Sequence, residues 1–224
     1  MTGYIDAVGA LGLIEWHRGF KPLALLLAIA LVAGRARSGG AIGRPAIALL
    51  LGLACSLAGD VLLMFPGFFV PGLVAFLAAH LSYIALFKQG LPWFPSHRAL
   101  LATLGLGLAM YAFLFNSLSP VLRVAVGAYV VVISLMAAQA VGRATLLRDR
   151  ASLAVAIGAG CFMLSDSLLA TNKFAFALPL AQVWVLASYY VAQILIARNT
   201  LEPVALAQAA PEASPAGLGL PQGG

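Results

Sequence analysis

Residues 44–65 read RPAIALLLGLACSLAGDVLLMF, a nearly unbroken apolar run with one acidic residue, Asp60, near its end. As an α-helix, about 20 residues rise roughly 30 Å, which is the thickness of the hydrocarbon core of a bilayer. The run therefore predicts a membrane-spanning helix. Because an ionisable side chain is costly to expose to lipid, Asp60 is expected to face the interior of a helix bundle.

Six further apolar runs follow along the chain. Its 224 residues are 62% hydrophobic and 9% charged, whereas a soluble domain usually carries about 25% charged residues. With residues 44–65, these runs predict an all-α, polytopic membrane helix bundle with seven clear transmembrane helices, in one domain over residues 1–200. The six runs are 20–34, 68–87, 99–116, 120–141, 151–171 and 175–197.

A short N-terminal helix is a separate candidate. Residues 4–16 are weakly apolar, but as a helix they rise only about 20 Å, which is less than the ~30 Å hydrocarbon core. They are a candidate eighth transmembrane helix, and their length leaves open whether they span the bilayer.

The basic residues give the predicted orientation. The net charge of +6 comes from Lys and Arg in short loops, which favours a topology signal over a nucleic-acid surface. Because basic loops are retained in the cytoplasm, we predict that the C-terminus is cytoplasmic. The expected location is a bacterial inner or plasma membrane. Residues 201–224, rich in Ala, Pro and Gly, are predicted to form a disordered cytoplasmic tail. The basic residues assigned to the cytoplasm are Arg35, Arg37, Arg44, Lys88, Arg98, Arg143, Arg148, Arg150 and Arg198.

The chain also resembles itself. GLACSLAGDVLL, residues 52–63, aligns with GAGCFMLSDSLL, residues 158–169, and the same offset pairs Tyr83 with Tyr189 without gaps. The offset spans four helices, so the halves would run in the same sense, as a 4+4 parallel repeat of eight helices. Chance similarity between low-complexity apolar segments is the alternative.

Two acidic residues stand inside apolar runs, Asp60 and Asp166. An unpaired carboxylate at such depth costs at least about 2.5 kcal/mol, so both are expected to face the bundle interior and to mark a site. Each lies about five residues, or roughly 8 Å, before the end of its helix, so the two carboxylates should share a depth. Interhelical hydrogen bonding without catalysis is the alternative role.

Other polar side chains in these runs are candidates for binding a substrate. His80 and Tyr83 share a helical face in FLAAHLSYIALF. Gln193 follows Tyr189 by four residues and Tyr190 by three in ASYYVAQILI. All of them could equally be packing residues or interhelical hydrogen bonds.

Lys21 stands with Pro22 at the start of KPLALLL, on the predicted outer side. Proline is favoured at the first position of a helix. A lysine at the interface would either extend toward the lipid headgroups or contact a phosphate group of a ligand. The second alternative makes Lys21 a candidate substrate-binding residue.

No metal site or other cofactor is predicted. Of the three histidines, only His80 lies in a predicted span, and neither an HxxxH nor a CxxC spacing occurs. Those spacings are typical of zinc sites.

Five segments in a fixed order give the chain a recognisable pattern: KPLALLL, CSLAGDVLLM, GLVAFLAAHLSYIALF, FMLSDSLLA and SYYVAQILI. In this order they resemble the lysoplasmalogenase family, also called YhhN-type membrane proteins. The resemblance covers residues 20–198. The first helix looks shorter here than the family usually shows.

The resemblance implies a membrane hydrolase that cleaves the vinyl ether bond of lysoplasmalogens. Its partners would be a lysophospholipid substrate and membrane lipid, and its products a fatty aldehyde and glycerophosphoethanolamine or glycerophosphocholine. Acid hydrolysis of a vinyl ether begins with protonation of the β-carbon and passes through an oxocarbenium ion that water captures.

Two carboxyl groups could divide that work. By analogy with glycosidases, one would act as the acid while the other, ionised, stabilises the cation and positions water. Asp60 and Asp166 are therefore the candidate catalytic residues, with the two roles unassigned. The candidate substrate-binding residues are Lys21, His80, Tyr83, Tyr189, Tyr190 and Gln193.

A small-solute or proton-coupled transporter is the alternative function. A parallel repeat and paired intramembrane carboxylates are also typical of transporters. A structural or lipid-binding membrane protein is a third alternative, in which both Asp residues would be dispensable.

Overall fold

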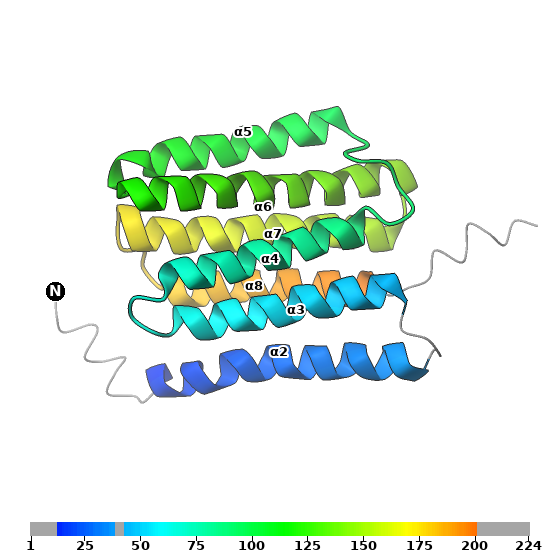
Figure 1. The fold of residues 1–224 in the computed structure, drawn as a ribbon, viewed down its shortest axis with the longest axis horizontal. Helices are drawn as coiled ribbons and strands as arrows, with labels where there is room; N and C mark the ends of the chain where they lie inside the picture. The colour runs from blue at the N-terminus through cyan, green and yellow to red at the C-terminus, as the bar shows by residue number, and fades with distance from the viewer. Residues whose placement is uncertain (1–12, 39–42, 201–224) are drawn as a thin grey trace, which may run out of the picture.

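The computed structural model describes residues 13–38 and 43–200, which form seven α-helices (Figure 1). These ranges contain no β-strand, and the predicted all-α class is confirmed. A 3₁₀ turn, Phe115–Ser117, follows α5, and a π-helix, Thr171–Ala175, follows α7. The helices are α2 (Leu13–Ser38), α3 (Arg44–Leu63), α4 (Phe69–Phe87), α5 (His97–Leu114), α6 (Pro120–Leu147), α7 (Arg150–Ala170) and α8 (Ala181–Asn199).

Five helical segments are long and apolar enough to cross a membrane. Large apolar side chains are exposed on their outer faces, among them Leu101 at 72% and Val124 at 76%. Such surfaces need lipid around them. The chain is therefore a multi-pass integral membrane protein. The five segments are Arg44–Leu63, Phe69–Phe87, His97–Ser117, Pro120–Leu147 and Arg150–Ala175.

Two of the seven described helices, α2 and α8, are not among these five segments. Within the described residues, α2 contributes a shorter apolar stretch, Leu25–Ala36. The α8 helix has 19 residues, but polar side chains such as Tyr189 and Gln193 interrupt it. All seven predicted runs form helices, and within the described residues five of them meet the length and hydropathy of a span.

The α8 helix begins at Ala181, although the apolar run begins at residue 175. After the π-helix the backbone becomes extended at Phe176, where φ is −158° and ψ is 154°. Pro179 then disfavours helical geometry at the residue before it, and Leu180 has a φ of 54°. The prolyl turn therefore shortens the last helix.

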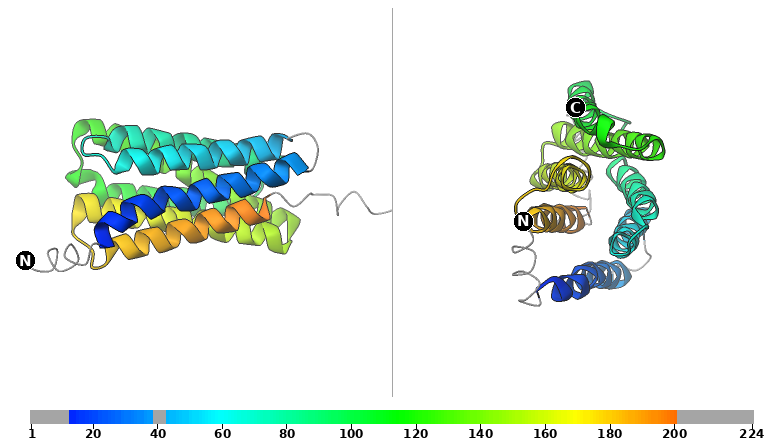
Figure 2. Two further views of the ribbon diagram at one scale, coloured as in Figure 1. Left: turned by 90° about the horizontal axis from the view of Figure 1, so that it is seen from below. Right: turned by 90° about the vertical axis from the view of Figure 1, so that its left-hand side faces the viewer.

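The helices pack as consecutive pairs, α3 with α4, α5 with α6, and α7 with α8. The α6 helix joins these pairs by packing against both α4 and α7. The end view in Figure 2 shows the α3–α4 pair facing the α7–α8 pair, while α2 lies at the edge beside α3. The proposed repeat pairs α3 with α7 and α4 with α8, so it relates these two facing pairs and stays a prediction.

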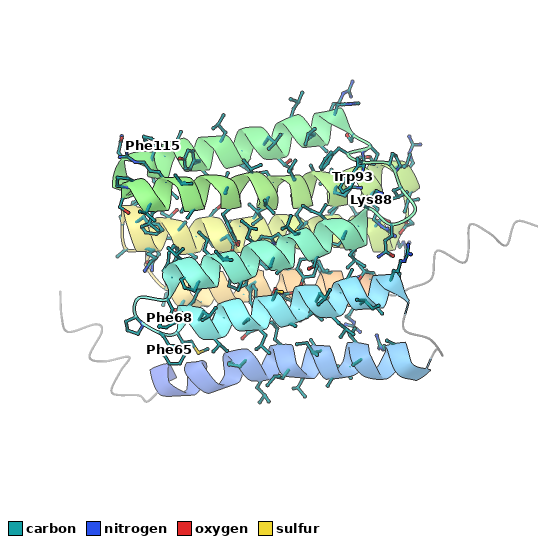
Figure 3. The ribbon with its side chains drawn as sticks, in the orientation of Figure 1. Phe65, Phe68, Lys88, Trp93 and Phe115 are labelled. Carbon is teal, nitrogen blue, oxygen red and sulfur yellow. The ribbon has the colours of Figure 1, made fainter. Side chains whose placement is uncertain are left out.

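Aromatic side chains lie at both ends of the bundle (Figure 3). Phe65, Phe68 and Phe115 lie at one end, called here the Phe115 end, and are at least 39% exposed. Trp93 and Lys88 lie at the other, called here the Trp93 end, where Lys88 Nζ is 5.0 Å from the centroid of the Trp93 ring. Aromatic residues near the ends of spans are typical of membrane–water interfaces.

The α7 helix begins with a side-chain cap outside the membrane spans. Asp149 accepts hydrogen bonds from the Ser152 amide at 2.7 Å and the Ser152 hydroxyl at 2.8 Å. Burial raises the pKa of the Asp149 carboxyl, but the Ser152 hydrogen bonds and the charge of Arg143 outweigh it, so the pKa is lowered from its ordinary value. Arg143 Nε also donates to Ser152 Oγ at 3.2 Å, which joins the end of α6 to the start of α7.

Two predicted segments lie outside the described residues. Of the candidate N-terminal helix, residues 4–12 are not described, and residues 13–16 belong to α2. The predicted tail, residues 201–224, is likewise outside the described chain. Both assignments stay predictions.

Candidate active site

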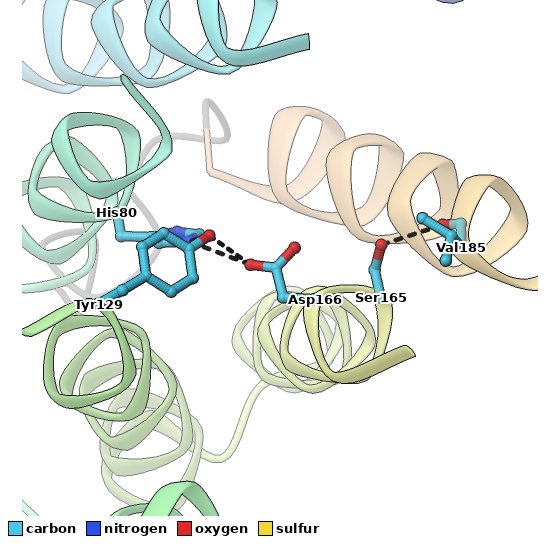
Figure 4. Close-up of polar contacts among 5 residues, drawn as sticks. All are labelled: His80, Tyr129, Ser165, Asp166 and Val185. Atoms are coloured by element: carbon cyan, nitrogen blue, oxygen red, sulfur yellow. Dashed lines mark hydrogen bonds and ion pairs between the residues drawn. The ribbon is translucent and has the colours of Figure 1, made fainter. Parts of the chain in front are cut away.

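Asp166, on α7, is held by side chains from two neighbouring helices (Figure 4). The Tyr129 hydroxyl, from α6, donates a hydrogen bond to Asp166 Oδ2. His80 Nε2, from α4, lies 2.8 Å from the Tyr129 hydroxyl and 3.5 Å from Asp166 Oδ2. The His80 side chain is fully buried, whereas that of Asp166 is 18% exposed.

The residue before Asp166 helps to orient it. The Ser165 hydroxyl donates to the Val185 carbonyl of α8 at 3.0 Å (Figure 4). Successive residues of an α-helix point about 100° apart. Because Ser165 faces α8, Asp166 is turned toward α4 and α6.

Asp60, on α3, has a different setting. It is 1% exposed, and the Tyr189 hydroxyl of α8 donates to its Oδ2 at 2.7 Å. Nearby, the Tyr83 hydroxyl of α4 donates to Gln193 Oε1 of α8, also at 2.7 Å. These two hydrogen bonds join the α3–α4 pair to α8.

Packed aromatic rings connect His80 and Tyr189, which are neighbours of the two carboxyl groups. The Phe162 ring centroid is 4.7 Å from that of His80 and 5.4 Å from that of Tyr189. The Phe76 ring lies 6.1 Å from Tyr189 and 6.3 Å from Phe162. The Asp60–Tyr189 pair and the Asp166–Tyr129–His80 group are therefore linked through packed rings.

A cavity of about 570 Å³ lies beside Asp166. Asp166 and Tyr129 line it, and apart from Thr103 and Ser167 its other walls are almost entirely apolar side chains of α4 to α7. The lining extends from Phe174, at the Phe115 end, to Ala156, ten residues before Asp166 on α7. Ligand pockets usually measure about 300–1,000 Å³, so the cavity has room for a long apolar ligand with Asp166 at its side.

The other predicted site residues lie around this cavity in different ways. His80, Tyr83, Tyr189 and Gln193 are buried in the packed core and are not part of the lining. Tyr190 is half-buried, and its ring centroid lies 5.6 Å from that of Tyr189. Lys21 belongs to α2, but its side chain falls outside the described residues.

Tyr129 is the site residue that sequence reasoning missed. It stands alone as a polar side chain in AVGAYVVV, within residues 125–132. A single tyrosine is ordinary in an apolar helix, so its partners on α4 and α7 become apparent only when the helices are packed. The one signal in the sequence was a hydroxyl group within an apolar helix, which needs a hydrogen-bond partner once it is buried.

Metal ligands do not gather in the described part of the chain. No group of three or more His, Cys, Asp or Glu side chains there could hold a metal ion. The site is instead built from carboxyl, phenol and imidazole groups, which can move protons.

The fold and the site together define a multi-pass helical membrane protein with a carboxyl group on the wall of an apolar cavity. Residues 16–200 match the YhhN family, and the chain belongs to that family. The family resemblance inferred from the sequence is thereby confirmed.

Named relatives cover about two thirds of the chain. Lysoplasmalogenase TMEM86A of Bos taurus is 33% identical over 159 residues, which are 69% of this chain and 65% of that protein. Lysoplasmalogenase TMEM86B of Sus scrofa is 38% identical over 144 residues, 64% of this chain and 59% of that protein. The match thus spans less than two thirds of either relative's length. No solved structure matches the chain.

Proposed function

We propose that this protein is a membrane hydrolase that cleaves the vinyl ether bond of lysoplasmalogens. The observation that carries the proposal is the position of Asp166, a carboxyl group on the wall of an otherwise apolar cavity. Relatives named lysoplasmalogenase support the choice of substrate.

The register of α7 supports one direction for the bound lipid. From Asp166 to Ala156 the helix rises about 15 Å along the cavity, which suits an alkenyl chain. The opposite direction leads to Phe174 and to the Phe115 end of the bundle, where the exposed aromatic side chains lie. The vinyl ether joins the chain to glycerol, so it would lie beside Asp166 with the headgroup toward the Phe115 end.

In the proposed reaction, protonated Asp166 gives its proton to the β-carbon of the alkene. The carbon that bears the ether oxygen becomes an oxocarbenium ion, and a water adds to it while its proton returns to the carboxylate. The resulting hemiacetal then collapses, breaking the bond between that carbon and the glycerol oxygen. One water is consumed, and one aldehyde and one glycerol hydroxyl are formed.

The neighbours of Asp166 suit this cycle. The Tyr129 hydroxyl donates to Oδ2, which leaves Oδ1 to carry the transferred proton. His80, bonded to Tyr129, holds that phenol in place. Catalytic groups need partners that fix their orientation before the substrate arrives.

Asp60 would act without lining the cavity itself. Its hydrogen-bond partner, Tyr189, packs its ring against those of Phe76 and Phe162. An ionised Asp60 would favour the developing cation electrostatically, because charges interact strongly in a bundle that excludes water. Tyr83, Tyr190 and Gln193 would shape this region, and Lys21 stays a candidate phosphate contact.

Orientation belongs to the same proposal. The basic connections, including those with Lys88 and Arg148, would face the cytoplasm together with the C-terminus. The Phe115 end, and with it the headgroup of the substrate, would then face outward. Reporter fusions at residues 94 and 146 should give cytoplasmic signals.

The test uses purified protein in detergent with lysoplasmalogen and, as a control, the corresponding ester lysophospholipid. We expect a fatty aldehyde from the first and no hydrolysis of the second. Protein that consumes neither lipid, but moves a solute across liposomes, would instead support the transporter alternative.

A further inference from the structure

The Phe115 end of the cavity carries a cation in an unusual setting. Lys173 Nζ lies 4.8 Å from the centroid of the Phe69 ring and 5.8 Å from that of the Phe174 ring. Phe69 and Phe174 both line the cavity that contains Asp166, and their ring centroids are 5.2 Å apart. The ammonium group therefore stands at the rim of this cavity.

The local backbone holds Lys173 at this rim. Thr171–Ala175 form a π-helix, closed by the Phe176 amide donating to the Thr171 carbonyl at 3.1 Å. Asn172 Oδ1 accepts from the Leu178 amide at 2.9 Å and so fixes the following turn. Short π-helical segments are frequent at functional sites.

The connections between the described helices at this end carry no acidic side chain. The connections 64–68, 115–119 and 171–180 contain no Asp or Glu. In the described part of the chain, the Lys173 ammonium faces aromatic rings and not a carboxylate. Arg123, the other described cation here, is occupied, because its Nε donates to the Phe115 carbonyl at 3.2 Å.

We infer that Lys173 binds the phosphate of the lipid substrate at the mouth of the cavity. The inference rests on the proposed function, and it assigns the headgroup contact to a residue that the sequence motifs did not single out. A lysine acts as a point charge for phosphate, and the aromatic pair below it restricts where that charge lies.

The spacing of Lys173 and Asp166 agrees with this inference. Seven residues of helix separate them, a rise of about 10 Å. In a lysoplasmalogen, about seven bonds connect the β-carbon of the alkene to phosphorus, which is about 8 Å when extended as a backbone is. An alkene at Asp166 would thus bring the phosphate within reach of the Lys173 ammonium.

Two substrates separate this contact from the rest of the reaction. The first is lysoplasmalogen, and the second is the 1-alkenylglycerol that lacks the phosphate group. We expect Lys173→Ala to lower the ratio of kcat/KM for the first over the second about tenfold, through KM, and Lys173→Arg to retain most of it. The preference of wild-type protein for lysoplasmalogen over the 1-alkenylglycerol should also weaken as ionic strength rises.

The chain provides a matched control in Lys88. Its ammonium also stacks on an aromatic ring, that of Trp93, but at the opposite end of the bundle (Figure 3). Lys88→Ala removes a comparable cation and should leave the ratio unchanged. An equal fall in both Lys→Ala variants, or none in Lys173→Ala, would overturn the inference.

Binding gives a readout that does not depend on turnover. The affinity of purified protein for an ester lysophospholipid should fall about tenfold in Lys173→Ala, while that for a monoacylglycerol should not. If wild-type protein releases no aldehyde, the proposed hydrolase fails, yet this selective loss would still identify a phosphate site. Equal affinity of wild-type and Lys173→Ala protein for the lysophospholipid would reject that site.

Discussion

Asp60 and Asp166 occupy matching positions in two similar helices, but their surroundings differ. Asp60 is 1% exposed and receives a hydrogen bond from Tyr189, on the last helix. The side chain of Asp166 is 18% exposed, lines the cavity and receives its hydrogen bond from Tyr129, on α6. Two carboxyl groups with one sequence signature can therefore have two different roles.

The tyrosines show where the two halves diverge. The repeat pairs Tyr189 with Tyr83, so a symmetric arrangement would have Tyr83 donating to Asp166. Tyr83 donates to Gln193 instead, and Tyr129 takes the position beside Asp166. We infer that Asp166 meets the substrate while Asp60 acts through the packed side chains around it.

The largest effect is expected from Asp166→Asn. Asparagine keeps the shape of the side chain and can still accept from Tyr129, but it cannot donate an acidic proton. Loss of a general acid costs about 10² to 10⁴ in rate, and kcat for aldehyde release should fall by that factor. Thermal unfolding in detergent is the control, and a folded variant with kcat within threefold of wild type would remove Asp166 from the mechanism.

Asp60→Asn should have a smaller effect. The variant retains a hydrogen-bond acceptor for Tyr189 and loses only the charge of a group that does not line the cavity. Because hydrogen bonds to charged groups contribute about 1.5–3 kcal/mol, we expect kcat to fall roughly 10- to 100-fold. The double variant should be scarcely slower than Asp166→Asn alone, since groups that act as one unit are not additive. A larger loss in Asp60→Asn than in Asp166→Asn would reverse the assigned roles.

Chain-length selectivity tests which side of Asp166 holds the hydrocarbon. Gly160 lines the cavity between Asp166 and Ala156, and a Cβ atom there would meet nothing within 4 Å. Gly160→Leu should fill this space and lower kcat/KM for long alkenyl chains by about tenfold relative to short ones, since each buried CH₂ contributes ~0.8 kcal/mol.

Gly105 offers the matched control for that variant. A Cβ atom at Gly105 would also meet nothing within 4 Å, but Gly105 does not line the cavity. Gly105→Leu should leave chain-length preference unchanged. Equal shifts in chain-length preference in both variants would mean that the alkenyl chain of the substrate lies elsewhere.

The smallest effect concerns the helix that carries Asp166. Asp149→Ala removes the cap of α7 and should cost about 0.5–2 kcal/mol of stability, seen as a lower Tm in detergent. The pKa of Asp149 is lowered in the folded protein, so its stabilisation is present at neutral pH and is lost as the pH falls through that pKa. The Tm difference between variant and wild type should shrink in acid.

An uncharged cap gives the comparison for this pH dependence. Ser96 caps α5 by accepting from the Ala99 amide at 3.3 Å, and serine does not titrate in this range. Ser96→Ala should lower Tm by a similar amount at every pH. A Tm difference for Asp149→Ala that stays constant down to acid pH would contradict the charged cap.

The helices could be predicted from the sequence because a long apolar run has one stable form in lipid. That form is an α-helix, in which the backbone groups hydrogen-bond to one another. It also indicated Asp60 and Asp166, since carboxyl groups are rare and costly in such runs. The asymmetry between them was not predictable. Tyr129 has no distinctive sequence context, and the turn at Pro179 moves the start of α8, so which tyrosine reaches which carboxylate depends on packing.

The most direct test of the account is chemical labelling of the carboxyl groups with an apolar carbodiimide, followed by mass spectrometry of the peptides. Such a reagent should enter the cavity and reach a protonated carboxyl on its wall, so we expect label on Asp166, suppressed by added lysoplasmalogen, and far less on Asp60. Label on Asp60 with Asp166 unmodified, or label on Asp166 that the lipid does not suppress, would contradict the claim that Asp166 is the group that meets the substrate.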